Sequence, residues 1–108
     1  MKPGCEVFCA GNAVVDVLAR PVDGLPAPGA SQRLEEVALG PGGNGVNTAM
    51  ALARLGVRVA LAALVGEDRL GEILRQSVRS EGVDDSNVIT VKEARTSVSM
   101  VLAESSGE

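Results

Sequence analysis

The stretch Gly40-Pro41-Gly42-Gly43-Asn44-Gly45-Val46-Asn47 decides the fold. Glycine occupies four of its first six positions, which predicts a turn rather than regular structure. Residues 46–55 follow at once, are rich in alanine and stop at Gly56, so they predict a helix with a glycine C-terminal stop. Such a turn lets the main chain approach a ligand closely, and the helix N-terminus offers free N–H groups. The pattern is therefore able to bind an anion or a hydroxyl-rich ligand.

Two other interpretations of this turn stay open at this point. Gly42 and Gly43 could serve only to make a tight turn, with Asn44 as the helix N-cap. The glycines also fit the dinucleotide pattern G-x-G-x-x-G, and Glu67 lies about where a ribose-binding acid belongs in a dehydrogenase. Pro41 inside the pattern and the polar segment before it make this match weak.

The remaining hydrophobic pattern alternates strands with helices. We expect strands near 6–10, 13–19, 31–39, 58–65, 87–91 and 97–102, and a second helix over 69–80. Strand–helix–strand units indicate a parallel sheet, and the surplus strands must lie outside it. The fold class is therefore α/β.

Acidic side chains supply the other candidate site residues. Asp16 lies in an apolar run, where it could grip two vicinal hydroxyls, although simple alternation would point it to solvent. Asp68 is expected to be an ordinary helix N-cap. Together with Glu67, Asp84 and Asp85 it could attract a cation, but we expect these acids to be solvated and predict no metal site.

Composition narrows the function classes. The 108 residues are 45% hydrophobic and 22% charged, which disfavours intrinsic disorder. The net charge of −4 disfavours nucleic acid and membrane surfaces as partners. The chain has no histidine and one aromatic residue, Phe8, so common zinc sites and base stacking are disfavoured. Cys5 and Cys9 are expected to be free thiols in a reducing cytoplasm. Residues 1–4 lack the apolar segment of a secretory leader.

Taken together, these pieces resemble the ribokinase-like (PfkB) family of carbohydrate kinases. The resemblance runs over essentially the whole chain and is carried by these segments: Gly11-Asn-Ala-Val-Val-Asp16, Leu25-Pro-Ala-Pro-Gly29, Gly42-Gly-Asn-Gly-Val-Asn47-Thr-Ala, Ala53-Arg-Leu-Gly56, Val65-Gly-Glu-Asp-Arg-Leu-Gly71, Glu81-Gly-Val-Asp84 and Thr96-Ser97. The resemblance implies a central α/β sheet with flanking helices and a small β-sheet lid over a sugar site. Residues 1–108 would form the N-terminal part of that kinase domain, with lid strands near 13–19, 31–39 and 97–102.

The resemblance also implies the site residues. Asp16, Gly42, Gly43 and Asn47 would contact sugar hydroxyls, and Asn44 matches a position where ketohexokinase-like members carry a substrate-contacting asparagine. Ribokinases carry a second polar contact where this chain has Val14, and that departure argues against ribose as the substrate.

The family's catalytic base belongs to a Gly-Ala-Gly-Asp motif that these residues do not contain. The resemblance therefore implies no catalytic residue in this chain, and ATP, Mg²⁺ and K⁺ sites only in the complete enzyme. We expect the chain alone to be an inactive sugar-binding and lid portion of an ATP-dependent sugar or nucleoside kinase, able to form a homodimer through its lid strands. A free-standing, non-catalytic module that binds a polyol or a partner is the alternative.

Overall fold

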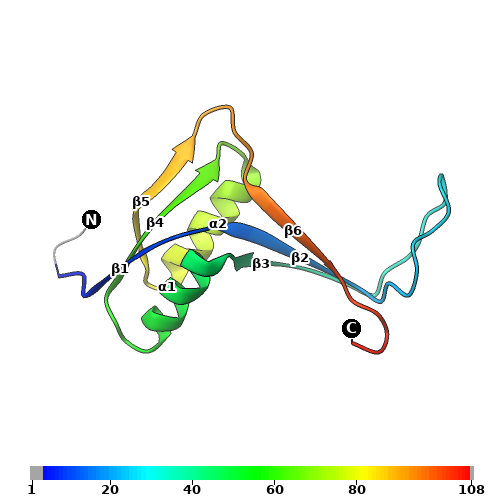
Figure 1. Cartoon of the computed structure of the whole chain (residues 1–108), viewed down its shortest axis with the longest axis horizontal. Coiled ribbons are helices and arrows are strands. Elements are labelled where there is room, and N and C mark those ends of the chain that lie inside the picture. Colours follow the sequence, from blue (N-terminus) through cyan, green and yellow to red (C-terminus); the bar gives the residue numbers. More distant parts are fainter. Residues whose placement is uncertain (1–3, 108) are drawn as a thin grey trace.

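The computed structural model describes residues 4–107, which form two three-stranded sheets and two helices (Figure 1). The elements, in chain order, are β1 (Val7–Ala10), β2 (Val14–Arg20), β3 (Glu36–Gly42), α1 (Asn44–Arg54), β4 (Val59–Gly66), α2 (Arg69–Ser80), β5 (Asp84–Val91) and β6 (Ser97–Leu102). The predicted α/β class is confirmed, and the described chain is elongated, with extents of 54 × 33 × 18 Å.

The first sheet is parallel and has the strand order β1-β4-β5. Both helices pack on one of its faces, because alternate residues of β4 such as Leu61 and Val65 join Met50 of α1 and Leu74 of α2 in the hydrophobic core. The opposite face is bare, since Phe8, Leu64 and Ile89 are 50%, 62% and 58% exposed. The βαβ pattern of the sequence thus predicted the parallel sheet correctly.

The second sheet has the order β3-β2-β6 and extends away from the helices (Figure 1). Its strand β2 pairs with β3 antiparallel and with β6 parallel. Every residue of β6 is exposed, whereas Val15 and Ala19 of β2 are buried. The segments expected near 13–19, 31–39 and 97–102 therefore do lie outside the parallel sheet and contribute strands to one separate sheet.

The strand expected over 31–39 was placed too early. Residues 31–35 are not in a strand, and β3 instead continues through Gly40, Pro41 and Gly42, the stretch expected to be a turn. Pairing with β2 overrides the local preference of these residues: Gly40 lies opposite Asp16 and Pro41 opposite Val15. Proline is tolerated because β3 is an edge strand, where a missing N–H need not leave a partner unsatisfied.

The other boundaries differ less. Helix α1 begins at Asn44, two residues before the predicted start, and its N-cap is Gly43, which makes no side-chain cap hydrogen bond. The interpretation of Asn44 as N-cap is therefore wrong. Gly43 has a φ of 93°, a conformation that favours glycine. Strand β5 begins at Asp84 rather than Asn87, whereas α2 and β6 have the predicted bounds.

A compact hydrogen-bonded cluster, which we call the junction, ties the second sheet to the first. Asp68, the predicted N-cap of α2, accepts hydrogen bonds from the N–H of Gly71 at 2.8 Å and from the N–H and hydroxyl of Thr96 at 2.8 and 2.6 Å. The Thr96 hydroxyl in turn accepts from the N–H of Gly66 at 2.9 Å. These bonds, with Thr96 as the principal donor, hold the pKa of Asp68 below its usual range.

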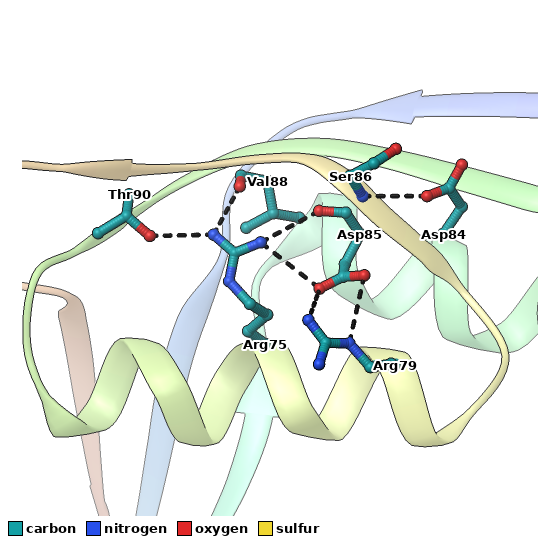
Figure 2. Close-up of polar contacts among 7 residues, drawn as sticks. All are labelled: Arg75, Arg79, Asp84, Asp85, Ser86, Val88 and Thr90. Carbon is teal, nitrogen blue, oxygen red and sulfur yellow. Dashed lines mark hydrogen bonds and ion pairs between the residues drawn. The ribbon is translucent and has the colours of Figure 1, made fainter. Parts of the chain in front are cut away.

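Arginines on α2 fix that helix against β5 (Figure 2). The Arg75 guanidinium donates to the carbonyl oxygens of Val88 and Asp85 at 2.6 and 3.1 Å and to the Thr90 hydroxyl at 3.0 Å. Arg79 pairs with the Asp85 carboxylate at 2.8 Å. The carbonyl groups of Val88 and Asp85 and the Asp85 carboxylate thus accept hydrogen bonds from arginines on one face of α2.

The expectation of solvated acids was consequently wrong for three of the four. Asp68 is engaged at the junction, Asp85 is ion-paired, and Asp84 is 9% exposed and accepts a hydrogen bond from the N–H of Ser86 at 3.0 Å. Glu67 is exposed. Asp68 and Asp84 stand at the start of an element, where backbone N–H groups need acceptors, whereas Asp85 is engaged by the two arginines of α2.

Both cysteines are free, and Cys9 is buried while Cys5 is half-buried. Burial raises the pKa of the Cys9 thiol. Within residues 4–107 no helix is long and apolar enough to cross a membrane. The prediction that residues 1–4 lack a secretory leader concerns a segment of which residues 1–3 lie outside the described residues.

Candidate functional site

The glycine stretch meets the β1–β2 connection at the point where the two sheets diverge. The Asn12 N–H donates to the Asn44 side-chain oxygen at 2.8 Å, and the Asn12 carbonyl accepts from the N–H of Val46 at 3.3 Å. A Cβ on Gly43 would lie 2.5 Å from the Asn12 carbonyl oxygen, and one on Gly11 would lie 2.7 Å from the Asn44 oxygen. Glycine is therefore required on both sides of this contact, and the start of α1 is held firmly in place.

Asp16 lies beside the same stretch, on the side of Gly42. A Cβ on Gly42 would come within 2.6 Å of the Asp16 carboxyl carbon, so the carboxylate rests against the bare Gly42 main chain. Asp16 is half-buried. Neither a hydrogen bond nor an ion pair is made by its carboxylate to any residue in the range 4–107. This leaves a carboxylate held close to backbone and open to an external donor.

The two asparagines differ in how they are used. The side-chain oxygen of Asn44 accepts the hydrogen bond from Asn12, so Asn44 has a structural role. Asn47 lies in the first turn of α1, its N–H bonded to the Gly43 carbonyl at 2.9 Å, and its side chain is exposed. The structure thus gathers Gly42, Gly43, Asn44 and Asn47 around the start of α1 and brings Asp16 against Gly42. Whether they touch a ligand stays a prediction.

A cavity of about 580 Å³ opens next to this cluster, between the two sheets. Gly11 and Asn12 form one wall, and Val14, Asn87 and Ser97 contribute from β2, β5 and β6. Neither Asn87 nor Ser97 is among the site residues predicted from the sequence. The sequence signal for Asn87 was a polar residue within an apolar strand. That signal indicates a position in the cavity wall only when the strand register is known, and the register places Asn87 opposite Ala62, beside a bulge in the β4–β5 pairing.

Among residues 4–107 there is no group of three or more cysteine, aspartate or glutamate side chains able to hold a metal ion. The groups gathered at the cluster are one carboxylate, two amide side chains and glycine main chain, all of which form hydrogen bonds. Such groups complement the paired donors and acceptors of hydroxyls.

Known proteins resemble this chain in sequence and in fold. A fructokinase structure with bound ATP from Xylella fastidiosa matches with a TM-score of 0.74 and 29% identity, over 90% of this chain and 29% of that one. A ribokinase of Haemophilus influenzae is 31% identical over 75% of this chain and 26% of its own length. Fructokinase-1 of Oryza sativa subsp. japonica is 40% identical over 63% of this chain and 21% of its own length.

These matches place the chain among ribokinase-fold kinases. Residues 6–108 match the family described as pfkB family carbohydrate kinase, and the chain belongs to that family. It spans roughly a quarter of the length of the two curated relatives above. The dehydrogenase interpretation of the glycines is wrong, because Gly40 and Gly42 end an antiparallel edge strand rather than the first strand of a parallel βαβ unit.

Proposed function

We propose that this chain forms the sugar-binding side of an ATP-dependent carbohydrate kinase. The observation that carries the proposal is the Asp16 carboxylate, which rests against Gly42 and has no partner among residues 4–107. A half-buried carboxylate without a partner is unfavourable unless a ligand supplies donors. Two neighbouring sugar hydroxyls would do so, and hydrogen bonds to a charged acceptor are the strong ones.

The neighbouring groups suit the same ligand. Gly42 and Gly43 let the main chain approach a sugar ring without a Cβ in the way. Asn47 can donate and accept through its exposed amide, and Asn44 can donate through the nitrogen of the amide whose oxygen holds Asn12. In this proposal the second sheet, β3-β2-β6, is the lid that covers the sugar, because it carries Asp16 and ends at Gly42.

Phosphoryl transfer itself requires groups that position and stabilise the transferred phosphate. We expect ATP, Mg²⁺ and K⁺ to be bound in the complete kinase and not well by these 108 residues, which we propose to be inactive alone and to act in the cytoplasm. A coupled assay with ATP and a panel of sugars would then give no turnover. ATP-dependent turnover that is abolished by Asp16→Ala would contradict this part of the proposal.

A non-catalytic polyol-binding module is the second candidate. Its basis is that a sugar site can bind without the residues that transfer phosphate. Sugar binding without turnover would be shared by both candidates. Adding a polypeptide that corresponds to the rest of a relative separates them, because only the kinase proposal predicts that turnover then appears.

We also propose that the second sheet mediates a homodimer. Its outer strands β3 and β6 are edges, and Met100 and Val37 are 66% and 60% exposed. Exposed apolar strands at an edge are prone to pair with another chain. Light scattering at increasing protein concentration should report twice the chain mass, and a monomer throughout would contradict the dimer.

The sugar site is tested by binding. Calorimetric titration of the chain with D-fructose and with D-ribose should detect at least one ligand, and Asp16→Asn and Asn47→Ala should each weaken it at least about tenfold. Glu104→Gln, which alters an exposed acid after β6, should bind like the wild type. Equal binding by wild type and Asp16→Asn would contradict the proposal.

A further inference from the structure

The connection from β5 to β6 lies directly against the first sheet. A Cβ on Gly66, the last residue of β4, would lie 2.4 Å from the Arg95 carbonyl carbon and 2.4 Å from the Thr96 nitrogen. A Cβ on Gly71 in α2 would lie 2.9 Å from the Thr96 hydroxyl oxygen. The absence of side chains at these two glycines therefore lets the segment before β6 contact the end of β4 and the first turn of α2.

Asp68 divides its two carboxylate oxygens between α2 and this segment. Its Oδ1 accepts from the Gly71 N–H at 2.8 Å, which caps α2, and from the Thr96 hydroxyl at 2.6 Å. Its Oδ2 accepts from the Thr96 backbone N–H at 2.8 Å. Thr96 is 6% exposed and immediately precedes β6. Hydrogen bonds to a charged acceptor are strong and directional, so one side chain fixes the start of β6 relative to α2.

The pairing registers carry this constraint to the proposed sugar site. Val14 of β2 lies opposite Gly42 of β3 on one side and opposite Ser97 of β6 on the other. Thr96 directly precedes this row, and Asp16 lies two residues beyond Val14 in β2. The tilt of the second sheet at this row therefore determines where the Asp16 carboxylate lies relative to the start of α1.

Apolar packing anchors the second sheet but does not set its tilt by itself. Val15 of β2 joins the hydrophobic core, and alternation turns it to the face of the sheet opposite Asp16. Burial of apolar surface is not directional. Every residue of β6 is exposed, so the hydrogen bonds of Thr96 supply the directional contact on that side of the sheet.

We propose that Asp68 and Thr96 are positioning residues for sugar binding: they fix the start of β6 on α2 and thereby hold the Asp16 carboxylate where it can accept hydrogen bonds from a sugar. Neither residue needs to contact the ligand. This role rests on the proposed sugar site and extends it to a part of the fold outside that site. It also goes beyond the helix N-cap that the sequence predicts for Asp68.

The variant Asp68→Asn separates the two functions of this side chain. With its oxygen at the Oδ1 position, asparagine keeps the bond to the Gly71 N–H, and it caps helices about as well as aspartate. Its amide nitrogen then faces the Thr96 N–H, and two donors form no hydrogen bond. In calorimetric titrations with D-fructose and D-ribose, at a temperature where the variant is folded, the sugar that binds the wild type should bind at least about fivefold more weakly.

Two double-mutant cycles test whether the effect passes through Asp16. Added to Asp16→Asn, the Asp68→Asn exchange should weaken sugar binding by less than about twofold, because the group that it positions is already altered. Added to Asn47→Ala it should keep its full factor, since Asn47 belongs to α1 and not to the second sheet. A general loss of structure would give the same factor in both backgrounds, and that result would overturn the inference.

Thr96 offers an independent pair of variants, which decides the question if Asp68→Asn fails to fold. Thr96→Val removes the hydroxyl and should weaken the sugar at least about fivefold, whereas Thr96→Ser keeps it and should bind like the wild type. The control is Glu81→Gln at the other end of α2, where the carboxylate pairs with Arg54 of α1 at 2.9 Å. This pair joins the two helices and not the second sheet, so its loss should leave sugar binding unchanged.

The sugar site and the positioning role fail in different ways. If Asp16→Asn weakens the sugar but Asp68→Asn and Thr96→Val bind it like the wild type, the sugar site stands and the positioning role is wrong. If the wild type binds neither D-fructose nor D-ribose, the sugar-site proposal fails and the positioning role fails with it.

Discussion

The two sheets of this chain differ in what holds them. Strand β4 of the parallel sheet is buried along most of its length, with Leu61 and Ala60 almost inaccessible, whereas every residue of β6 in the second sheet is exposed. Burial of apolar side chains is the main stabilising contribution in proteins of this size. The first sheet and its two helices therefore supply most of the stability, and the second sheet is anchored to them through Val15 of β2 and through its polar connections.

That difference locates the candidate site. Asp16 comes from the second sheet, Asn47 from a helix packed on the first, and the glycine stretch spans the boundary. The alignment of these groups depends on a few polar links, the Asn12–Asn44 contact and the Asp68–Thr96 junction. A site built across such a boundary can change its geometry while the core remains folded.

The largest effect is expected in the core of the first sheet. Leu61→Ala should lower the free energy of unfolding by about 3 kcal/mol, because it removes a fully buried side chain and leaves a cavity. Met100→Ala on the exposed face of β6 should change it by less than about 0.5 kcal/mol. Urea denaturation followed by circular dichroism measures both, and equal losses would remove the contrast between the sheets.

The junction should give the next largest effect. Thr96→Val keeps the shape of a buried side chain but removes the hydroxyl that bonds Gly66 and Asp68, and we expect a loss of about 1–2 kcal/mol. Thr90→Val is the matched control, since its exposed hydroxyl makes only one bond, to Arg75. A smaller loss for Thr96→Val than for Thr90→Val would argue against the junction as the principal link.

A glycine pair sharpens the account of the site. Gly42→Ala would push a Cβ against the Asp16 carboxylate, so it should abolish sugar binding while lowering stability by only about 1 kcal/mol. Gly40→Ala, two residues earlier in β3, meets nothing within 4 Å and should leave binding intact. Calorimetric titration of the two variants tests this, and unaltered binding by Gly42→Ala would exclude the proposed position of Asp16.

Acid should weaken the junction by a smaller, pH-dependent amount. The pKa of Asp68 is lowered in the folded chain, so the unfolded chain takes up the proton first as pH falls. The stabilisation by Asp68 is thus complete above the ordinary aspartate value, about 4, and is lost as pH falls below it. Urea midpoints between about pH 2 and 5 should fall less steeply for Asp68→Asn than for the wild type. An equal fall of the urea midpoint with pH in Asp68→Asn and in the wild type would contradict the stabilising role of the Asp68 carboxylate.

The elements that sequence predicts well are those determined by their own residues. Helix α2 and strand β6 have the expected bounds because an amphipathic repeat with an Asp68 N-cap defines the first and an apolar run after Thr96 the second. The start of β3 and the glycines at its end were misplaced, since their conformation comes from pairing with β2, which local sequence does not show.

The site shows the same division. Asp16 and the glycines could be singled out because a carboxylate in an apolar run and a glycine-rich turn are visible in sequence. Their proximity could be predicted only through a family resemblance. Asn87 was missed as a residue of the cavity wall, since its position there follows from the register between β4 and β5, which local sequence does not show.

The central claim is that the boundary between the two sheets binds a sugar. Two-dimensional ¹H–¹⁵N NMR of the labelled chain during titration with D-fructose and D-ribose tests it most directly. The account predicts that the backbone amide signals of Gly42, Gly43 and Asn47 shift with ligand concentration, while the backbone amide signal of the exposed β6 residue Met100 does not. Saturating sugar with no change at these amides, or with changes confined to other parts of the chain, would contradict the account.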